Sequence, residues 1–181
     1  MFELARIFGR IAFLMGKPYE VPDTERVLHI AVVAALVSYI LAALPHVGWP
    51  SALGHALLDL TLTGLALYAG LQILGKGVRF RRAFAALSGA SCYINLASIP
   101  ISYSSASRRA ELAAAQTAGL EPPPPLLAQE IAQFVFLVWG ISLLAHVLRF
   151  SFDTTIPISV GVAVAYVLVA VSVFGFIFGT H

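Results

Sequence analysis

The sequence predicts an all-α integral membrane protein with five transmembrane helices and an N-terminal amphipathic interfacial helix. Of its 181 residues, 59% are hydrophobic and only 11% are charged, and the mean hydropathy is +0.88. Soluble domains carry about 25% charged residues, so this chain lacks the polar side chains needed to cover a surface that faces water. Because the bilayer core offers backbone groups no water, its spans must be helices rather than open sheets.

The chain divides into a cytoplasmic segment, residues 1–25, and a membrane domain, residues 26–181. In the first part, apolar residues recur every three or four positions up to residue 15, with Glu3, Arg6 and Arg10 on the opposite side. That pattern is typical of an amphipathic helix lying in the membrane interface. The alternative is a helix packed on the cytoplasmic ends of the spans. The three charges interrupt any apolar run of signal-peptide length, so no cleavable signal peptide is expected.

The membrane domain contains five apolar segments, each long enough to cross a bilayer. A spanning helix needs about 20 mostly apolar residues. The third segment is the most polar, and Pro100 is expected to kink it. Beyond it, residues 108–117 are expected to form a short separate helix, and prolines 122–125 a stiff polyproline II spacer. The expected spans cover residues 27–44, 52–74, 83–105, 126–148 and 156–179.

The basic residues between the spans predict the orientation. If successive connections alternate between the two sides, one side carries nine basic residues and the other carries two. Cytoplasmic loops are enriched in Lys and Arg, so we expect a cytoplasmic N-terminus and a C-terminus outside. Four of the nine lie in the stretch GKGVRFRR, where contact with anionic lipid headgroups is expected: Lys76, Arg79, Arg81 and Arg82.

Ionisable residues inside the spans are the candidate functional residues. A charged side chain near the bilayer centre costs about 2.5–3.5 kcal/mol on insertion scales, and usually has a partner or a role. His55 and Asp59 are one helical turn apart and share a face of the second span. The predicted topology places Glu130 and Gln133, at the start of the fourth span, at a comparable depth. The two carboxylates and the imidazole could therefore converge.

Three interpretations of these residues are open. The first is structural, with Asp59 hydrogen-bonded to His55 or to a neighbouring helix and Glu130 reaching the outer interface. The second is a divalent metal site, because one histidine and two carboxylates suit zinc or manganese, although no motif with metal-ligand spacing is found. The third is a polar lining for the path of a substrate, ion or proton.

Catalytic and cofactor motifs are not found in the sequence. It has no GxSxG, P-loop or CxxC motif, and its one cysteine, Cys92, excludes an intramolecular disulfide and a Cys-based zinc site. We therefore expect no cofactor and no nucleic-acid partner, and a membrane-embedded enzyme stays open only in a metal-dependent form. In the fifth span, Gly161 with Ala165 and Gly175 with Gly179 place small residues four apart, which permits the close approach of another helix. That helix could belong to this chain, to a second copy or to another membrane protein.

The stretch GLQILGKGVRFRRAFAALSGASCYINLASIP resembles the Yip (Ypt/Rab-interacting protein) family and its bacterial relatives. In that family a span is followed by a Gly-containing basic turn, a Phe, and a small-residue span with a Tyr and a late Pro. The corresponding positions here are Gly75, Gly77, Phe80, Ala90, Tyr93 and Pro100. The resemblance implies a Yip-like domain of five spans over the whole chain. The Ala-, Leu- and Val-rich composition looks bacterial, which implies a bacterial cytoplasmic (inner) membrane and no Rab partner.

Two functions are consistent with these features. The first is a non-enzymatic scaffold or accessory subunit that organises membrane lipid or binds a membrane partner, including a second copy through Gly175 and Gly179. The alternative is a small transporter or channel component, with a polar path that uses His55, Asp59 and Glu130. The scaffold would tolerate loss of the carboxylates, whereas the transporter would not.

Overall fold

The computed structural model is a bundle of long helices and describes residues 2–121, 124 and 126–179. Within these residues, α2 (Glu25–Ile73), α3 (Phe80–Thr117), α4 (Leu127–Phe152) and α5 (Ile156–Phe178) are long and apolar enough to span a membrane. The short helix α1 (Phe2–Ala12) precedes them, and the 3-10 turns η1 (Pro18–Glu20) and η2 (Gly77–Arg79) precede α2 and α3. The all-helical class is confirmed for the part of the chain that the structure describes.

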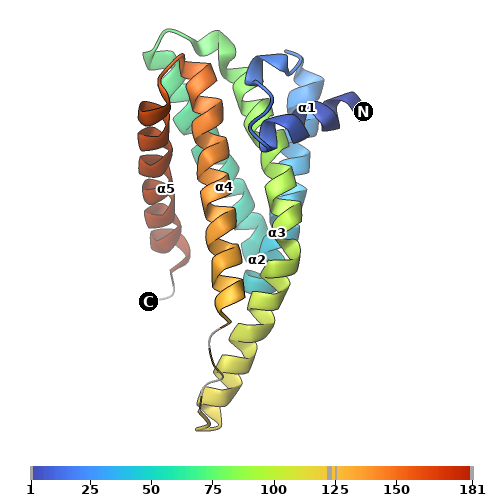
Figure 1. Cartoon of the computed structure of the whole chain (residues 1–181), viewed down its shortest axis with the longest axis vertical. Coiled ribbons are helices and arrows are strands. Elements are labelled where there is room, and N and C mark those ends of the chain that lie inside the picture. The colour runs from blue at the N-terminus through green and yellow to red at the C-terminus, as the bar shows by residue number, and fades with distance from the viewer. Residues whose placement is uncertain (1, 122–123, 125, 180–181) are drawn as a thin grey trace.

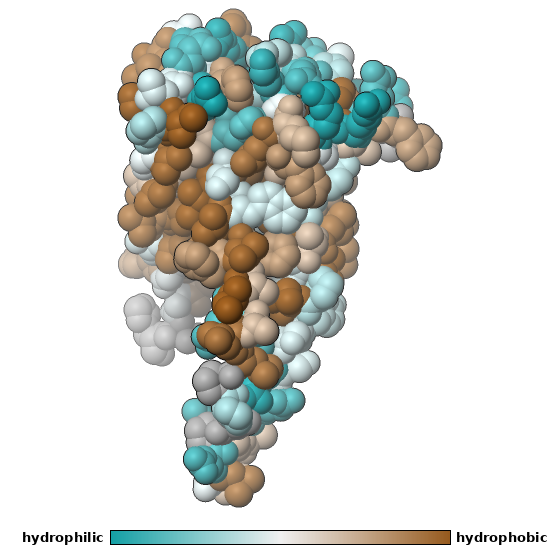
Figure 2. Space-filling model, viewed as in Figure 1, coloured by the Kyte–Doolittle hydropathy of each residue, from teal (hydrophilic) through white to brown (hydrophobic). Residues whose placement is uncertain are grey.

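The surface has the polarity expected of a protein in a membrane. Figure 2 shows hydrophobic side chains over the middle of the visible face and hydrophilic ones gathered towards its two ends. Large apolar side chains on α4 and α5 are exposed, among them Phe134, Leu168 and Phe176. Exposed apolar patches of this extent mark contact with lipid or with another protein, and together with the helix lengths they indicate a membrane location.

The structure has four long helices where the sequence predicted five, because the first two expected spans lie in the 49-residue helix α2. A straight helix of that length would extend about 70 Å, at about 1.5 Å per residue. Instead, α2 is broken at Gly48, whose φ of 73° and ψ of 171° fall in a region that essentially only glycine adopts. Pro45 and Pro50 flank the break and lack the N–H that a continuous helix uses.

The break folds α2 into two arms, residues 25–47 and 49–73, that lie against each other. Tyr39 of the first arm and Asp59 of the second line the same cavity, and Ile40 packs with Ala52. Figure 1 shows the bundle segments running in alternating directions, so that α1 lies near one end and α5 finishes towards the other. We call these the N-terminal end and the opposite end.

Helix α3 is longer than the sequence predicted. Residues 108–117, expected to form a separate short helix, continue α3 without interruption, and Pro100 lies inside the helix without ending it. Figure 1 shows the last turns of α3 extending past the opposite end of the bundle before the chain returns in α4. Of the expected polyproline spacer, Pro122, Pro123 and Pro125 lie outside the described residues.

Helix α1 is the predicted amphipathic helix, but its apolar face packs on protein. Phe8 and Ala12 are buried, and the Ala12 carbonyl accepts a 2.7 Å hydrogen bond from the Trp139 indole of α4. The Tyr93 hydroxyl of α3 donates a 2.6 Å hydrogen bond to the Ala5 carbonyl. This packing agrees with the alternative prediction of a helix docked on the bundle, whereas the position of α1 relative to the membrane interface stays a prediction.

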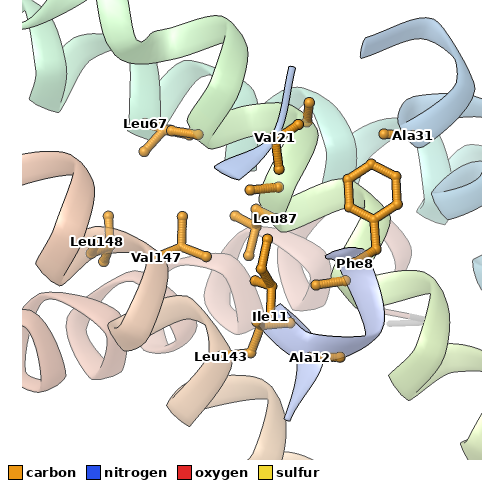
Figure 3. Close-up of a cluster of buried hydrophobic side chains, with 14 of the residues drawn as sticks. Phe8, Ile11, Ala12, Val21, Ala31, Leu67, Leu87, Leu143, Val147 and Leu148 are labelled. Carbon is orange, nitrogen blue, oxygen red and sulfur yellow. The ribbon is translucent and has the colours of Figure 1, made fainter. Parts of the chain in front are cut away.

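The main hydrophobic core lies where α1 meets α2, α3 and α4. Figure 3 shows side chains of all four helices gathered there, including Phe8, Leu67, Leu87 and Val147. Gly89 of α3 permits the close approach of α1, because a Cβ at that position would lie 2.5 Å from the Phe8 ring. The core fills the bundle interior near its N-terminal end with apolar side chains.

The basic turn between α2 and α3 holds the C-terminal end of α4. The Lys76 ammonium donates a 2.6 Å hydrogen bond to the Phe152 carbonyl and lies 3.0 Å from the Asp153 carboxylate. The Arg79 guanidinium lies 2.7 Å from that carboxylate and donates a 3.3 Å hydrogen bond to the Ser151 carbonyl. Cations are favourable here because the last carbonyls of a helix have no partners within it.

The other two basic residues of that stretch also have partners within the chain. Arg81 and Arg82 lie 3.7 Å and 3.6 Å from the Asp23 carboxylate, just before α2. The four residues predicted to bind lipid headgroups thus also join the connections of the bundle. Their contact with headgroups stays a prediction.

Replacing Gly89 with alanine is expected to loosen α1 from the bundle, because the added methyl group would overlap the Phe8 ring. Overpacking costs about 1–3 kcal/mol of unfolding free energy, offset in part by the helix propensity of alanine, about 1 kcal/mol better than glycine. We expect a lower unfolding temperature in detergent and faster proteolysis at Arg10. Gly161→Ala is the matched control, since its Cβ would meet no described atom of another element within 4 Å. Equal stability of the two variants would contradict this packing.

Replacing Asp153 with asparagine should lower stability in a pH-dependent way. Hydrogen bonds from Lys76 and Arg79 hold the pKa of Asp153 below its ordinary value, which is about 3.9. A lowered pKa stabilises the fold above the ordinary pKa, and this contribution is lost as the pH falls through the folded-state pKa. The unfolding temperature of Asp153→Asn should lie below that of the native protein at neutral pH and approach it below a pH of about 4.

Asparagine isolates the charge in this experiment, because Asp153 has a φ of 52° and asparagine tolerates that left-handed conformation. A difference in unfolding temperature that stays constant with pH would show that the carboxylate charge is not what holds the turn.

Candidate functional site

A polar cavity of about 170 Å³ is lined by residues from both arms of α2 and from α3, α4 and α5. Its apolar lining includes Leu60, Leu87 and Leu144, and Gly140 lines its α4 side. Polar groups are costly inside a membrane bundle, and ionisable ones usually mark a functional site. The polar side chains that line this cavity come from three helices: Tyr39, Asp59, Thr63, Ser88, Ser91, Asn95 and Tyr166.

Two side-chain hydrogen bonds connect the walls of this cavity. The hydroxyl oxygens of Thr63 and Tyr166 lie 2.6 Å apart, which joins the second arm of α2 to α5. The Asn95 amide of α3 donates a 3.2 Å hydrogen bond to the Ser38 hydroxyl of the first arm. The cavity therefore has walls fixed by polar contacts between helices that are far apart in the sequence.

Asp59 is the only carboxyl among the described residues that line the cavity. It forms none of the ion pairs found in the part of the chain that the structure describes. A carboxylate in an apolar environment without a cation beside it is costly, and binding of a proton or a cation removes that cost. Asp59 is therefore placed to bind a positive species that enters the cavity.

Ser88 adds a second group able to bind a ligand. Its side chain is 3% exposed, it lines the cavity, and its hydroxyl oxygen has no hydrogen-bond partner among the described residues. Buried polar side-chain atoms are hydrogen-bonded in the large majority of cases. The Ser88 hydroxyl can therefore donate to, or accept from, a molecule in the cavity.

The structure does not bring His55, Asp59 and Glu130 into one site. His55 packs against the rings of Phe174 and Phe178 in α5, with centroid separations of 5.3 Å and 3.9 Å. It does not line the cavity around Asp59. In the described part of the chain, no three histidine, cysteine or acidic residues lie close enough to hold a metal ion.

Glu130 and Gln133 line a separate pocket of about 290 Å³ between α3 and α4. We call it the opposite-end pocket; its polar lining also includes Ser105, Arg108, Arg109 and Gln129. Arg108 forms a 3.0 Å ion pair with Glu111 and donates to the Pro124 carbonyl. The sequence-based interpretation treated the two arginines as loop charges, because the continuation of α3 past Ser105 was not predicted.

The small-residue face of α5 is not used for packing within the described bundle. Gly161 and Gly175 each face open space, with no described atom of another element within 4 Å of an added Cβ, and Gly179 is exposed. Association with a second copy or another membrane protein through Gly175 and Gly179 stays a prediction.

Comparisons with known proteins identify no relatives of this chain. No family model, no curated protein and no solved structure matches it. The likeness to the Yip family therefore rests on the quoted sequence stretch alone, and the functional argument rests on the cavity.

Proposed function

We propose that this chain is a small membrane transporter or channel component that binds a proton at Asp59. The observation that carries the proposal is a carboxyl group, unpaired with any described cation, lining a polar cavity inside an apolar bundle. Intramembrane acids that line a cavity are typical of proton and ion paths. Of the three residues that the sequence suggested for a polar path, this proposal keeps Asp59.

The other cavity groups suit a proton better than a metal ion. Tyr39, Thr63 and Tyr166 carry hydroxyls, each of which can both donate and accept a hydrogen bond. Such groups can pass a proton along a chain of hydrogen bonds. The divalent metal site considered from the sequence uses one histidine and two carboxylates, whereas the described residues that line this cavity offer one carboxylate and no histidine. We therefore favour the proton over a divalent cation.

The orientation of the chain in the membrane and its resemblance to the Yip family are also part of this proposal. The N-terminal end carries the basic turn with Lys76 and Arg79, and the positive-inside rule favours the cytoplasm for such a turn. The resemblance to bacterial Yip-like proteins supports a bacterial inner membrane and the same orientation. On this basis the opposite-end pocket faces the outside of the cell.

A scaffold function is the second candidate, favoured by two surfaces that the Asp59 site does not use. One is the exposed small-residue face of α5. The other is an apolar groove of about 440 Å³ between α1, α2 and α3, lined by Phe2, Ala34 and Leu96 among others. A scaffold would not depend on the carboxyl of Asp59.

Proton flux in liposomes tests the proposal. Purified protein is reconstituted with a pH-sensitive dye inside the vesicles, and a potassium gradient with valinomycin imposes the membrane potential. We expect flux with the native protein and a fall to the level of empty vesicles with Asp59→Asn, because the amide cannot bind and release a proton. Asp23→Asn is the matched control, since it makes the same chemical change outside the cavity, and it should retain the flux.

Stability separates this function from a structural role of Asp59. Removing a structural hydrogen-bond acceptor would lower the unfolding temperature, whereas replacing a costly, partly buried acid with a neutral amide should leave it unchanged or raise it. Native-level flux in Asp59→Asn, or absence of flux in the native protein, would remove the proposed function and favour the scaffold.

A further inference from the structure

We propose that one polar face of α3 forms a half-channel that connects the opposite-end pocket to the Asp59 cavity and carries water-borne protons from that side only. This inference rests on the proposed function, because Asp59 is the group that the half-channel serves. It adds a path and a direction of access that the cavity alone does not give.

The polar face is visible in the spacing of six residues, which we call the polar track. They alternate at intervals of three and four, so they lie on one side of the helix, and none of them is exposed. With a helix rise of about 1.5 Å per residue, the track is about 25 Å long. This length approaches the thickness of a bilayer core, roughly 30 Å. Its members are Ser88, Ser91, Asn95, Ser98, Ser102 and Ser105.

The two ends of the polar track open into the two polar pockets. Ser88, Ser91 and Asn95 line the Asp59 cavity, and Ser105 lines the opposite-end pocket, beside Arg108. Figure 1 shows α3 running alongside both α2 and α4 towards the opposite end, so the track lies on a helix that joins the two places. One helix face thus connects the carboxyl to a mouth at the end of the bundle.

Polar atoms without partners occur at both ends of the track. The Ser88 hydroxyl oxygen is one, and the other is Nδ1 of His46, a buried atom that has no hydrogen-bond partner among residues 2–121, 124 and 126–179. The other ring nitrogen of His46 lies 3.5 Å from the Ser105 hydroxyl. Buried polar sites of this kind are where proteins bind ordered water, so both ends of the track are suited to hydration.

The hydroxyls along the track are compatible with water beside them. Ser98 donates a 2.8 Å hydrogen bond to the Asn95 carbonyl, and Ser105 donates one of 2.8 Å to the Ile101 carbonyl. Such bonds satisfy the hydroxyl proton within the helix and leave oxygen lone pairs free to accept from water. The alternative is a face of small residues that only permits close helix packing, which would be dry.

Access from the N-terminal end is blocked by the main hydrophobic core. Leu87 lines the Asp59 cavity and belongs to that core. Leu67, Leu143 and Val147 are also buried in it, and Figure 3 shows these side chains grouped with those of α1. In this conformation polar species therefore reach Asp59 from one side, and net proton flux across the membrane requires a second conformation in which the core opens towards the N-terminal end.

The reactivity of introduced cysteines tests this path. Cys92→Ser removes the chain's one cysteine, and Ser98→Cys or Ser102→Cys then places a thiol of nearly the same size in the track. A membrane-impermeant cationic methanethiosulfonate reagent is applied to one face of oriented vesicles at a time. We expect both thiols to react, and only from the face that also labels Glu111→Cys, at the exposed end of α3.

Two control variants define a dry environment. Leu96→Cys lies on the same helix but on its exposed apolar side, and Val147→Cys lies in the core; neither should react from either face. Track cysteines as unreactive as these two, or reactive from both faces, would overturn the half-channel.

The labelling result is independent of the flux assay. One-sided labelling without Asp59-dependent flux would support the hydrated path but contradict the proposed function. Asp59-dependent flux with unreactive track cysteines would keep the function and remove this path. If both hold, modification of Ser102→Cys should also block the flux, because the added group fills the path.

Discussion

The reversal of α2 at Gly48 is the constraint on which the rest of the bundle depends. An apolar chain in a membrane must satisfy its backbone groups within helices, so it can turn back only where the helix is interrupted. Gly48 adopts dihedral angles open to few other residues, between two prolines that weaken the helix. This reversal sets Tyr39 opposite Asp59, and so it creates the first two walls of the polar cavity.

Much of the fold could be predicted from the sequence, because the hydropathy of a segment indicates whether lipid or water surrounds it. The apolar segments, the amphipathic first helix and the choice of Asp59 as a candidate residue all follow from which side chains a bilayer tolerates. The partners of His55 and Glu130 could not be predicted in this way. Two residues four positions apart share a helix face, but they differ by about one turn in height and by a fraction of a turn in direction. On α2 this offset places His55 against the aromatic rings of α5 and Asp59 at the cavity.

The position of α1 shows a related limit. An amphipathic pattern identifies an apolar face, but hydropathy does not distinguish a face that is covered by lipid from one that is covered by protein. In this structure one steric fit and one hydrogen bond hold α1 on the bundle. Gly89 leaves space for the Phe8 ring, and the Trp139 indole donates a hydrogen bond to the last carbonyl of α1. These contacts join residues far apart in the sequence, and no local periodicity reports them.

The contact of Lys76 and Arg79 with Asp153 also has a consequence during synthesis of the chain. Arg79 and Asp153 are separated by 74 positions, which at about 5–20 residues per second is a delay of roughly 4–15 s on the ribosome. Throughout that interval both cations lack this carboxylate, so the charges on which the predicted orientation depends are not neutralised by it. Once Asp153 has been made, the same two residues join the last hairpin to the first.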